Sequence, residues 1–195
     1  MNIGAMKRRQ RHEGKAVTGR APSSHYVALA GEFFVLGELA LRRLDGTLTL
    51  GPTKEIDILV LNRATGRTFR LEVKTGGSGI RRNHIFRSYG YEWFMNERHA
   101  HLEAPDLVYC FVRLDARLER QRFFLVPSAD VASYIRWEYR HWRRHSKRQT
   151  GKVSPMRTFR VPVEESPRMA LPQSWRDGRW RRWKDNWAIF GPTRG

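Results

Sequence analysis

The clearest alternation of apolar and polar positions lies between residues 55 and 75. Two alternating runs flank residues 62–67, a segment that contains Gly66. Alternation with a period of two around a glycine-containing turn predicts a β-hairpin. If the turn is centred between Ala64 and Thr65, three apolar pairs face each other on one side of the sheet. These pairs are Ile56 with Val73, Ile58 with Leu71, and Val60 with Phe69.

The same register places Asp57 opposite Glu72 on the other side of the hairpin, with Lys74 two residues further on. Facing residues have Cβ atoms about 4.5–5.5 Å apart, so the two carboxylates repel unless a cation lies between them. A divalent metal fits between such groups, and the lysine suits a water-activating or charge-stabilising role. The alternative is an ordinary hairpin whose solvent-facing side carries common charged residues.

The segment before the hairpin is unusually apolar. Ser23 or Ser24 can cap a helix that runs to about Leu44, and we expect that helix to be buried on most of its surface. Glu32 is conspicuous there, because the residues three, four and seven positions away on its face are apolar. A buried carboxylate needs a partner or a metal. Glu32 is therefore either a functional residue or a structural carboxylate satisfied within the fold.

After the hairpin we expect a glycine-rich loop over residues 75–90, a helix from Tyr91 to about Leu102, and strands over residues 106–114 and 121–126. Ser128 is predicted to cap a helix through about His145. Residues 146–178 are predicted to be irregular apart from the alternation at residues 159–163. Three tryptophans with helical spacing follow, which favours core packing over base stacking. They are Trp180, Trp183 and Trp187.

Composition changes the picture by adding charge. The chain has 195 residues, of which 40% are hydrophobic, and 37 Lys and Arg against 19 Asp and Glu give a formal net charge of +18. This balance favours a polyanionic partner, with nucleic acid ahead of an anionic membrane surface. No apolar run approaches the length of a membrane-spanning helix. Cys110 is the only cysteine, so no internal disulfide or cysteine-rich zinc site is expected. The N-terminus lacks the apolar region of a signal peptide, which predicts a cytoplasmic protein.

Basic residues gather in three stretches that could contact phosphate. Residues 1–22 are predicted to form a flexible basic arm, with a disordered tail as the alternative. The loop after Lys74 and the helix after Ser128 supply the other two, and in the helix the arginines alternate with aromatic residues. The alternatives are a solvated loop and an ordinary amphipathic helix. The candidate nucleic-acid contacts are Arg81, Arg82, His84 and Arg87 in the loop, and Arg136, Arg140, Arg143 and Arg144 in the helix.

The order of these features resembles the PD-(D/E)XK superfamily of restriction-endonuclease-like nucleases. That family has an acidic residue on its first core helix, an Asp at the start of one strand and a (D/E)-x-K triplet on the next, which here correspond to Glu32, Asp57 and Glu72-Val73-Lys74. The segment G-E-F-F-V-L-G-E-L also resembles the opening of a bacterial group of such nucleases. The proline that often precedes the Asp is absent, and Glu55 shares the face of Asp57 as an additional acidic group.

The resemblance implies an α/β (α+β) fold with a mixed central β-sheet flanked by helices, of the αβββαβ type. It divides the chain into the arm at 1–22, a nuclease core at 23–145 and a basic, Trp- and Arg-rich C-terminal extension at 146–195 packed on the core. It further implies that Asp57, Glu72 and the Val73 carbonyl hold Mg²⁺ or Mn²⁺. Lys74 would orient the attacking water, and Glu32 would orient a ligand water or help to hold a second metal.

The function that the resemblance implies is a metal-dependent DNA endonuclease with a restriction, repair or junction-resolving role. A non-catalytic nucleic-acid-binding protein with the same fold and an RNA-directed nuclease are the alternatives, and a membrane-surface protein is a distant fourth. Because cutting both strands of a duplex usually requires two active sites, a homodimer is also expected.

Overall fold

The computed structural model describes residues 22–49, 56–76, 81–115, 120–146, 154–163, 169–176 and 178–193. The helices are α1 (Ser24–Leu41) and α2 (Ser128–His145), and the short 3₁₀ turns are η1 (Glu97–Ala100), η2 (Gln173–Trp175), η3 (Arg179–Trp183) and η4 (Trp187–Phe190). The strands are β1 (Asp45–Leu48), β2 (Ile58–Asn62), β3 (Arg67–Gly76), β4 (Arg81–Asn83), β5 (Ser88–Asn96), β6 (Leu107–Arg113), β7 (Arg122–Pro127) and β8 (Met156–Pro162).

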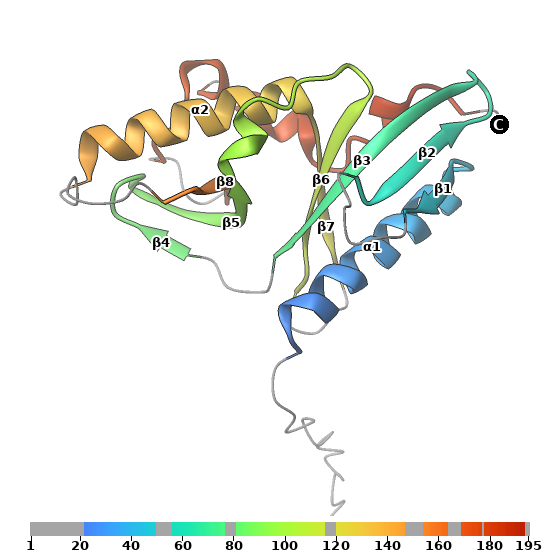
Figure 1. Ribbon diagram of the computed structural model, residues 1–195, viewed down its shortest axis with the longest axis horizontal. Helices are drawn as coiled ribbons and strands as arrows, with labels where there is room; N and C mark the ends of the chain where they lie inside the picture. Colours follow the sequence, from blue (N-terminus) through green and yellow to red (C-terminus); the bar gives the residue numbers. More distant parts are fainter. Residues whose placement is uncertain are drawn as a thin grey trace, which may run out of the picture.

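Two sheets organise the described part of the chain (Figure 1). The larger has five strands in the order β1-β2-β3-β6-β7, with β3 and β6 parallel and the other neighbours antiparallel. The smaller contains β4, β5 and β8, all antiparallel. Helix α1 packs on one face of the large sheet, and α2 and the small sheet cover the other. The predicted mixed sheet flanked by helices is therefore confirmed.

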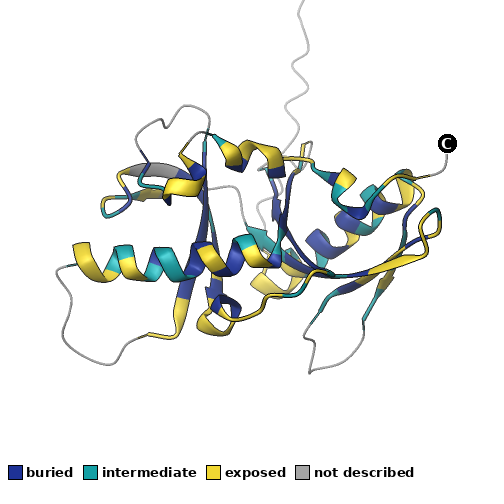
Figure 2. Ribbon diagram, turned by 90° about the horizontal axis from the view of Figure 1, so that it is seen from above, coloured by how far each residue is buried: buried dark blue, intermediate teal, exposed yellow. Residues whose placement is uncertain are grey.

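Two hydrophobic cores lie on opposite faces of the large sheet. One joins Val35 and Leu39 of α1 to the apolar side of the hairpin, and the other joins Tyr109 and Phe111 of β6 to the small sheet and α2. Because both of its faces are covered, β6 is buried along its whole length. Figure 2 shows this as dark strands at the centre of the molecule. Such two-sided burial explains the continuous apolar run at residues 107–112.

The hairpin forms in the predicted register for two of its three apolar pairs. Ile58 pairs with Leu71 and Val60 with Phe69, and all four are buried. The third pair was predicted wrongly. Ile56 packs against the core that contains Tyr109, whereas Val73 lies in the core beneath α1. The ladder runs from Ile58 to Asn62, so the chain leaves it at Asp57.

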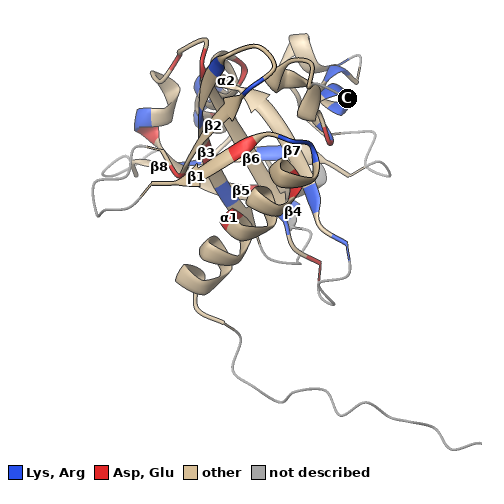
Figure 3. Ribbon diagram, turned by 90° about the vertical axis from the view of Figure 1, so that its right-hand side faces the viewer, with Lys and Arg blue, Asp and Glu red and all other residues tan. Residues whose placement is uncertain are grey.

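Helix α1 occurs where it was predicted, with Ser23 at the N-cap, but it ends at Leu41. The prediction that most of its surface is buried was wrong. Only one stripe faces the sheet, while Tyr26, Phe33 and Leu41 are 65%, 57% and 81% exposed. The helix is also nearly free of charge, and it is mostly tan in Figure 3. The apolar residues on all sides of the helix predicted burial on most of its surface. The sheet, however, covers only one side of the helix.

The predicted helix from Tyr91 to Leu102 is wrong. Residues 88–96 form β5, and only residues 97–100 are helical, as the 3₁₀ turn η1. Part of the predicted loop at 75–90 is also regular, because β3 reaches Gly76 and β4 pairs with β5. The partner that stabilises β5 is β8, whose Phe159 faces Trp93. That pairing joins residues far apart in the sequence, so local patterns do not reveal it.

The next three elements were predicted almost to the residue: β6, β7 and α2. Ser128, however, is the first residue of α2 rather than its cap. Its hydroxyl accepts the Ala104 N–H at 2.9 Å and donates to the Ala104 carbonyl at 2.8 Å. Deeper in, Arg160 of β8 binds Glu92 of β5 at 2.9 Å and Glu138 of α2 at 2.7 Å. This buried triad fixes α2 on the small sheet.

The C-terminal tryptophans are buried as predicted, but they do not lie on one helix. Trp180 and Trp183 belong to η3 and Trp187 to η4, with Asp185 at a φ of 51° between the two turns. Trp183 enters the core below α2, whereas Trp187 enters the core below α1. Between them Lys184 forms a β-bridge with Phe124 of β7. The segment therefore wraps around the β7 edge of the large sheet and contributes to both cores.

The described helices are all too short or too polar to cross a bilayer. The loop at 51–54, the acidic Glu55 and residues 1–21 of the predicted arm at 1–22 lie outside the described residues. The division of the chain into arm, core and extension stays a prediction. Strand β8 and the tryptophan segment, both within the predicted extension, are built into the second sheet and the two cores.

Candidate active site

Asp57 lies at the open end of the hairpin, one residue before β2. Its Oδ2 accepts a hydrogen bond from the Val73 backbone N–H at 2.7 Å, and its own N–H donates to the Leu71 carbonyl at 3.0 Å. Thr49 supports this bend, because its N–H donates to the Asp57 carbonyl at 2.9 Å. The side chain therefore replaces a ladder bond, and this holds the carboxylate beside β3. This contact corrects the prediction that Asp57 faces Glu72 as a ladder pair.

Glu72 and Lys74 project from the side of β3 that faces the small sheet. The Lys74 Nζ lies 2.5 Å from Glu72 Oε1, and the two side chains are 26% and 6% exposed. The pKa of Glu72 is raised above its usual value, mainly because the carboxyl is buried. Lys74 and Arg98 oppose this rise, and the negative charge of Asp57 adds to it. The structure thus brings together Asp57, Glu72 and Lys74, as the sequence predicted, although the role of each in catalysis stays a prediction.

Three neighbours of this group were missed by sequence reasoning: Tyr109, His99 and Arg98. Tyr109 pairs with Glu72 in the β3–β6 ladder, and its hydroxyl lies 2.8 Å from Nδ1 of the buried His99. Burial, with the charges of Lys74 and Arg98, lowers the pKa of His99 to about 4. The imidazole is therefore neutral at pH 7, and its bond to Tyr109 stiffens the wall beside Glu72. The expectation of a helix from Tyr91 to Leu102 hid these contacts.

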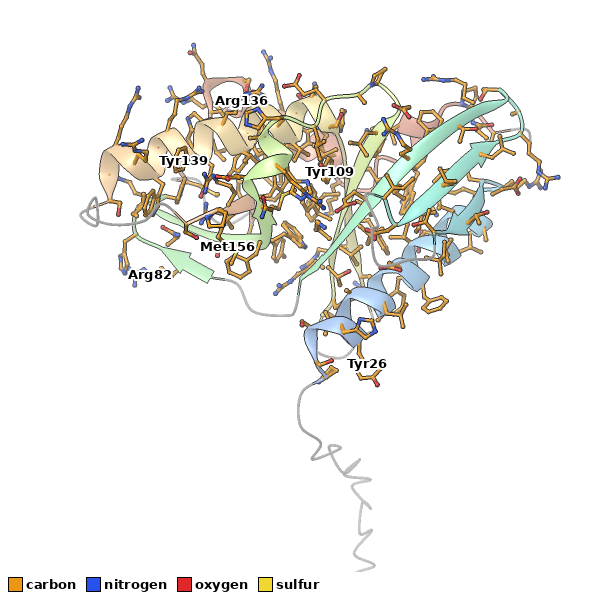
Figure 4. The ribbon with its side chains drawn as sticks, in the orientation of Figure 1. Tyr26, Arg82, Tyr109, Arg136, Tyr139 and Met156 are labelled. Carbon is orange, nitrogen blue, oxygen red and sulfur yellow. The ribbon has the colours of Figure 1, made fainter. Side chains whose placement is uncertain are left out.

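A cleft of about 680 Å³ opens beside Lys74. Its wall comes from the end of β5, η1 and the start of β8, including Arg98, His99 and Met156. A second cleft of about 540 Å³ lies between η1 and α2, and the two share Asn96 and Arg98. Figure 4 shows Met156 by the small sheet, and Arg136 and Tyr139 along α2. The two clefts therefore adjoin at these shared residues, one on the side of Lys74 and the other below α2.

The predicted basic contacts fall into two groups. Arg136 and Arg140 line the cleft below α2, where Arg136 donates to the Ala100 carbonyl at 2.7 Å and pairs with Glu103 at 2.6 Å. Arg143 and Arg144 are exposed at the end of the same helix. In the loop region Arg82, His84 and Arg87 are exposed on the hairpin of β4 and β5, and the side chain of Arg81 lies outside the described residues. Their contact with nucleic acid stays a prediction.

Glu32 is buried on α1, where the helix crosses β3. The neighbouring Gly31 touches Thr75 so closely that a Cβ added to this glycine would lie 1.8 Å from Thr75 Oγ1. Glu32 is therefore held near the residue that follows Lys74. However, Thr75 shares the α1 side of β3, while Glu72 and Lys74 point to the other side. The predicted role of Glu32 in holding a ligand water or a second metal stays a prediction.

The donor set suits a hard divalent cation with few protein ligands. Magnesium is commonly held by one or two carboxylates, with waters and substrate phosphate completing its shell. Asp57 and Glu72 are two such groups, and each uses one oxygen in the contacts above. Within the described ranges, no cluster of three or more His, Cys, Asp or Glu side chains is suited to a metal. The described residues therefore fit a site with two carboxylate ligands.

Comparisons with known proteins add little to this description. No family model matches the chain, and no curated protein matches it. One similar solved structure is that of a bacterial homing endonuclease, I-Ssp6803I, with 14% sequence identity and a TM-score of 0.49. The alignment covers 86% of this chain and 90% of that chain. This is a distant likeness in shape, and it carries no conclusion about function.

Proposed function

We propose that the protein is a metal-dependent DNA endonuclease that hydrolyses phosphodiester bonds. The observation that carries the proposal is the placement of Asp57, Glu72 and Lys74 at one end of β3, beside a cleft edged by arginine. A mostly buried carboxylate with a raised pKa is costly to keep ionised without a cation close by. Perturbed groups of this kind, placed in a cleft, favour a catalytic site.

Asp57 and Glu72 would hold Mg²⁺ or Mn²⁺, with the Val73 carbonyl as a further ligand. Bound there, the metal would polarise the scissile phosphate and lower the pKa of an attached water. Asp57 keeps its orientation because the Val73 N–H fixes one of its oxygens. Lys74, held by Glu72, can orient the attacking water and stabilise the charge that develops on the phosphate. The neutral His99 and Tyr109 keep the inner wall rigid and free of competing charge.

The two adjoining clefts suggest how a polyanionic strand would reach this site. Arg98 lies between them, and Arg136 and Arg140 line the far end below α2. Phosphate contacts of this kind position a strand without reading its sequence. The net charge of +18 supports binding to nucleic acid in general. A homodimer would place two such sites on the two strands of a duplex, which sedimentation velocity with and without DNA can test.

The test is cleavage of supercoiled, linear, branched and single-stranded DNA with Mg²⁺, Mn²⁺ or chelator. The wild-type protein should cut at least one substrate with metal and none with chelator. Asp57→Asn and Lys74→Met should lose this activity. Asp106→Asn is the matched control, because the partner of Asp106 is Arg70, four residues before Lys74 on β3, and this variant should cut normally.

Other outcomes identify the alternatives. Tight, salt-sensitive DNA binding without cleavage of any substrate would indicate a binding protein with the same fold. Cleavage of RNA alone would reassign the substrate and keep the chemistry. Wild-type cleavage by Asp57→Asn or Lys74→Met would overturn the proposed site.

A further inference from the structure

The side of α1 that faces away from the large sheet is an exposed apolar surface. Four large side chains on the helix are between 36% and 81% exposed: Phe34, Phe33, Tyr26 and Leu41. Figure 4 shows Tyr26 near the start of the helix, extending away from the sheet. The two acidic residues of the helix are engaged elsewhere, because Glu32 is buried and Glu38 pairs with Arg42 at 2.5 Å. Exposed apolar surface of this extent marks a site of interaction.

Large and small residues alternate along the middle of this surface. Tyr26, Ala30, Phe33 and Gly37 follow one another at spacings of four, three and four residues, which is the seam along which two helices pack side by side. In such a seam the large side chains of one helix fill the spaces beside small residues of the other. Gly37 provides open space of this kind, because a Cβ placed there would meet no atom within 4 Å. The opposite stripe of the helix already packs on the sheet.

The alternation matches itself when a second copy of α1 runs in the opposite direction. Suppose that Ala30 of one copy lies beside Phe33 of the other. Four residues separate Tyr26 from Ala30 and also Phe33 from Gly37, so Tyr26 of one copy then lies beside Gly37 of the other. Every large residue of the seam thus faces a small one. A two-fold interface requires self-complementarity of this kind.

Area and charge both favour a second copy as the occupant of this surface. At about 200 Å² for a large side chain, the four exposed residues offer roughly 450–500 Å² per protomer, so a pair of such surfaces approaches the roughly 1,000 Å² that a specific interface buries. Two molecules with a charge of +18 repel each other, and a neutral surface is where they can meet. The helix contains no lysine or arginine, which a nucleic acid or an anionic membrane surface would require.

We propose that this surface of α1 is a dimer interface, in which two copies of the chain pack their α1 helices antiparallel about a two-fold axis between Ala30 and Phe33. Glu72 and Lys74 project from the other side of the large sheet, so association leaves the clefts of both protomers open. The inference does not depend on the proposed function, because the interface requires neither metal nor nucleic acid.

The first test is sedimentation velocity of the nucleic-acid-free protein over a wide range of concentration, at low and at high salt. The wild type should form a reversible dimer that becomes tighter with salt, because salt screens the repulsion of like charges and leaves apolar contacts intact. Phe33→Ala should weaken the dimer about 100-fold in Kd, about tenfold for each of the two symmetry-related rings. Phe94→Ala is the matched control, since Phe94 is 52% exposed on β5 and should not affect Kd.

The second test exchanges large and small residues to examine the register. Ala30→Phe sets a ring against the Phe33 ring of the other copy and should weaken the dimer. The double variant Ala30→Phe/Phe33→Ala again places a large residue beside a small one, so its Kd should return to within about tenfold of the wild-type value. Thermal unfolding at a concentration where the wild type is monomeric should give the same Tm for Phe33→Ala and the wild type, because the ring lies on an exposed surface of the monomer.

Several results would overturn the proposal. They are a wild type that stays monomeric at every concentration and salt, a dimer that Phe33→Ala leaves unchanged, and a double variant that associates no better than the single variants. A monomer that Phe33→Ala strongly destabilises would show that another segment of the same chain covers the surface. Binding of the wild type, but not of Phe33→Ala, to phosphatidylcholine vesicles without dimerisation would assign the surface to a membrane instead.

Discussion

Replacing Asp57 tests the site most sharply, because its carboxylate has two separable effects. One oxygen accepts the Val73 N–H at 2.7 Å, and the negative charge raises the pKa of Glu72. Asn keeps the acceptor and removes the charge, so Asp57→Asn should cost about 1 kcal/mol or less. Ala removes both and leaves the Val73 N–H without its acceptor, which costs about 1–3 kcal/mol. For a chain of this length each kcal/mol corresponds to a Tm change of roughly 2–4 °C.

The assay compares chemical unfolding of both variants with cleavage by both. Cleavage should be lost in each, whereas stability should be lost mainly in Asp57→Ala. The pKa of Glu72 should fall in Asp57→Asn, since a neighbouring negative charge has gone, and ¹³C-detected NMR titration of the side-chain carboxyl can follow it. Equal destabilisation of the two variants would refute the role of the Val73 contact. A Glu72 pKa that is unchanged in Asp57→Asn would refute the electrostatic coupling.

Three further predictions concern Lys74, His99 and Gly31. Lys74→Met should raise the pKa of Glu72 further. Calorimetry should then show that, as the pH falls, Mn²⁺ binding is lost at a higher pH in this variant than in the wild type. The folded-state pKa of His99 is about 4, below its usual value near 6.5, so the wild type should lose stability as pH falls from about 6.5 to 4. His99→Gln should flatten that part of a denaturant-midpoint profile. Gly31→Ala should destabilise by about 1–3 kcal/mol, because the new Cβ would overlap Thr75 Oγ1.

Gly37 on the same helix provides the control for Gly31. A Cβ there would meet no atom within 4 Å, so Gly37→Ala should stabilise the protein by up to about 1 kcal/mol through helix propensity. If both glycine variants shift the unfolding midpoint in the same direction, the close contact between α1 and β3 does not explain why position 31 is a glycine.

The hairpin was predictable because its information is local. Alternation fixes which residues face the core, and the position of the turn fixes the register. The pairs Ile58 with Leu71 and Val60 with Phe69 could therefore be predicted by counting residues from the turn. The same counting failed at Ile56, two residues before the ladder begins at Ile58. There the Asp57 side chain takes over a backbone hydrogen bond, and no pattern of hydrophobicity encodes that change.

The walls of the site were not predictable, because long-range pairing builds them. Strand β5 depends on β8, whose Phe159 faces Trp93. Without that partner the segment was predicted to be a helix, and nothing then related His99 to Glu72.

The tryptophan segment has a consequence for self-association. The outer edge of a β-sheet offers unpaired backbone groups on which another chain can add a strand, and proteins protect such edges with charges, bridges and covering segments. At β7 all three devices coincide: Lys184 forms the single bridge to Phe124, while Trp183 and Trp187 fold over opposite faces. We expect disruption of Trp187 to open this edge and to promote β-type aggregation before the end of the hairpin that carries Asp57 is disturbed.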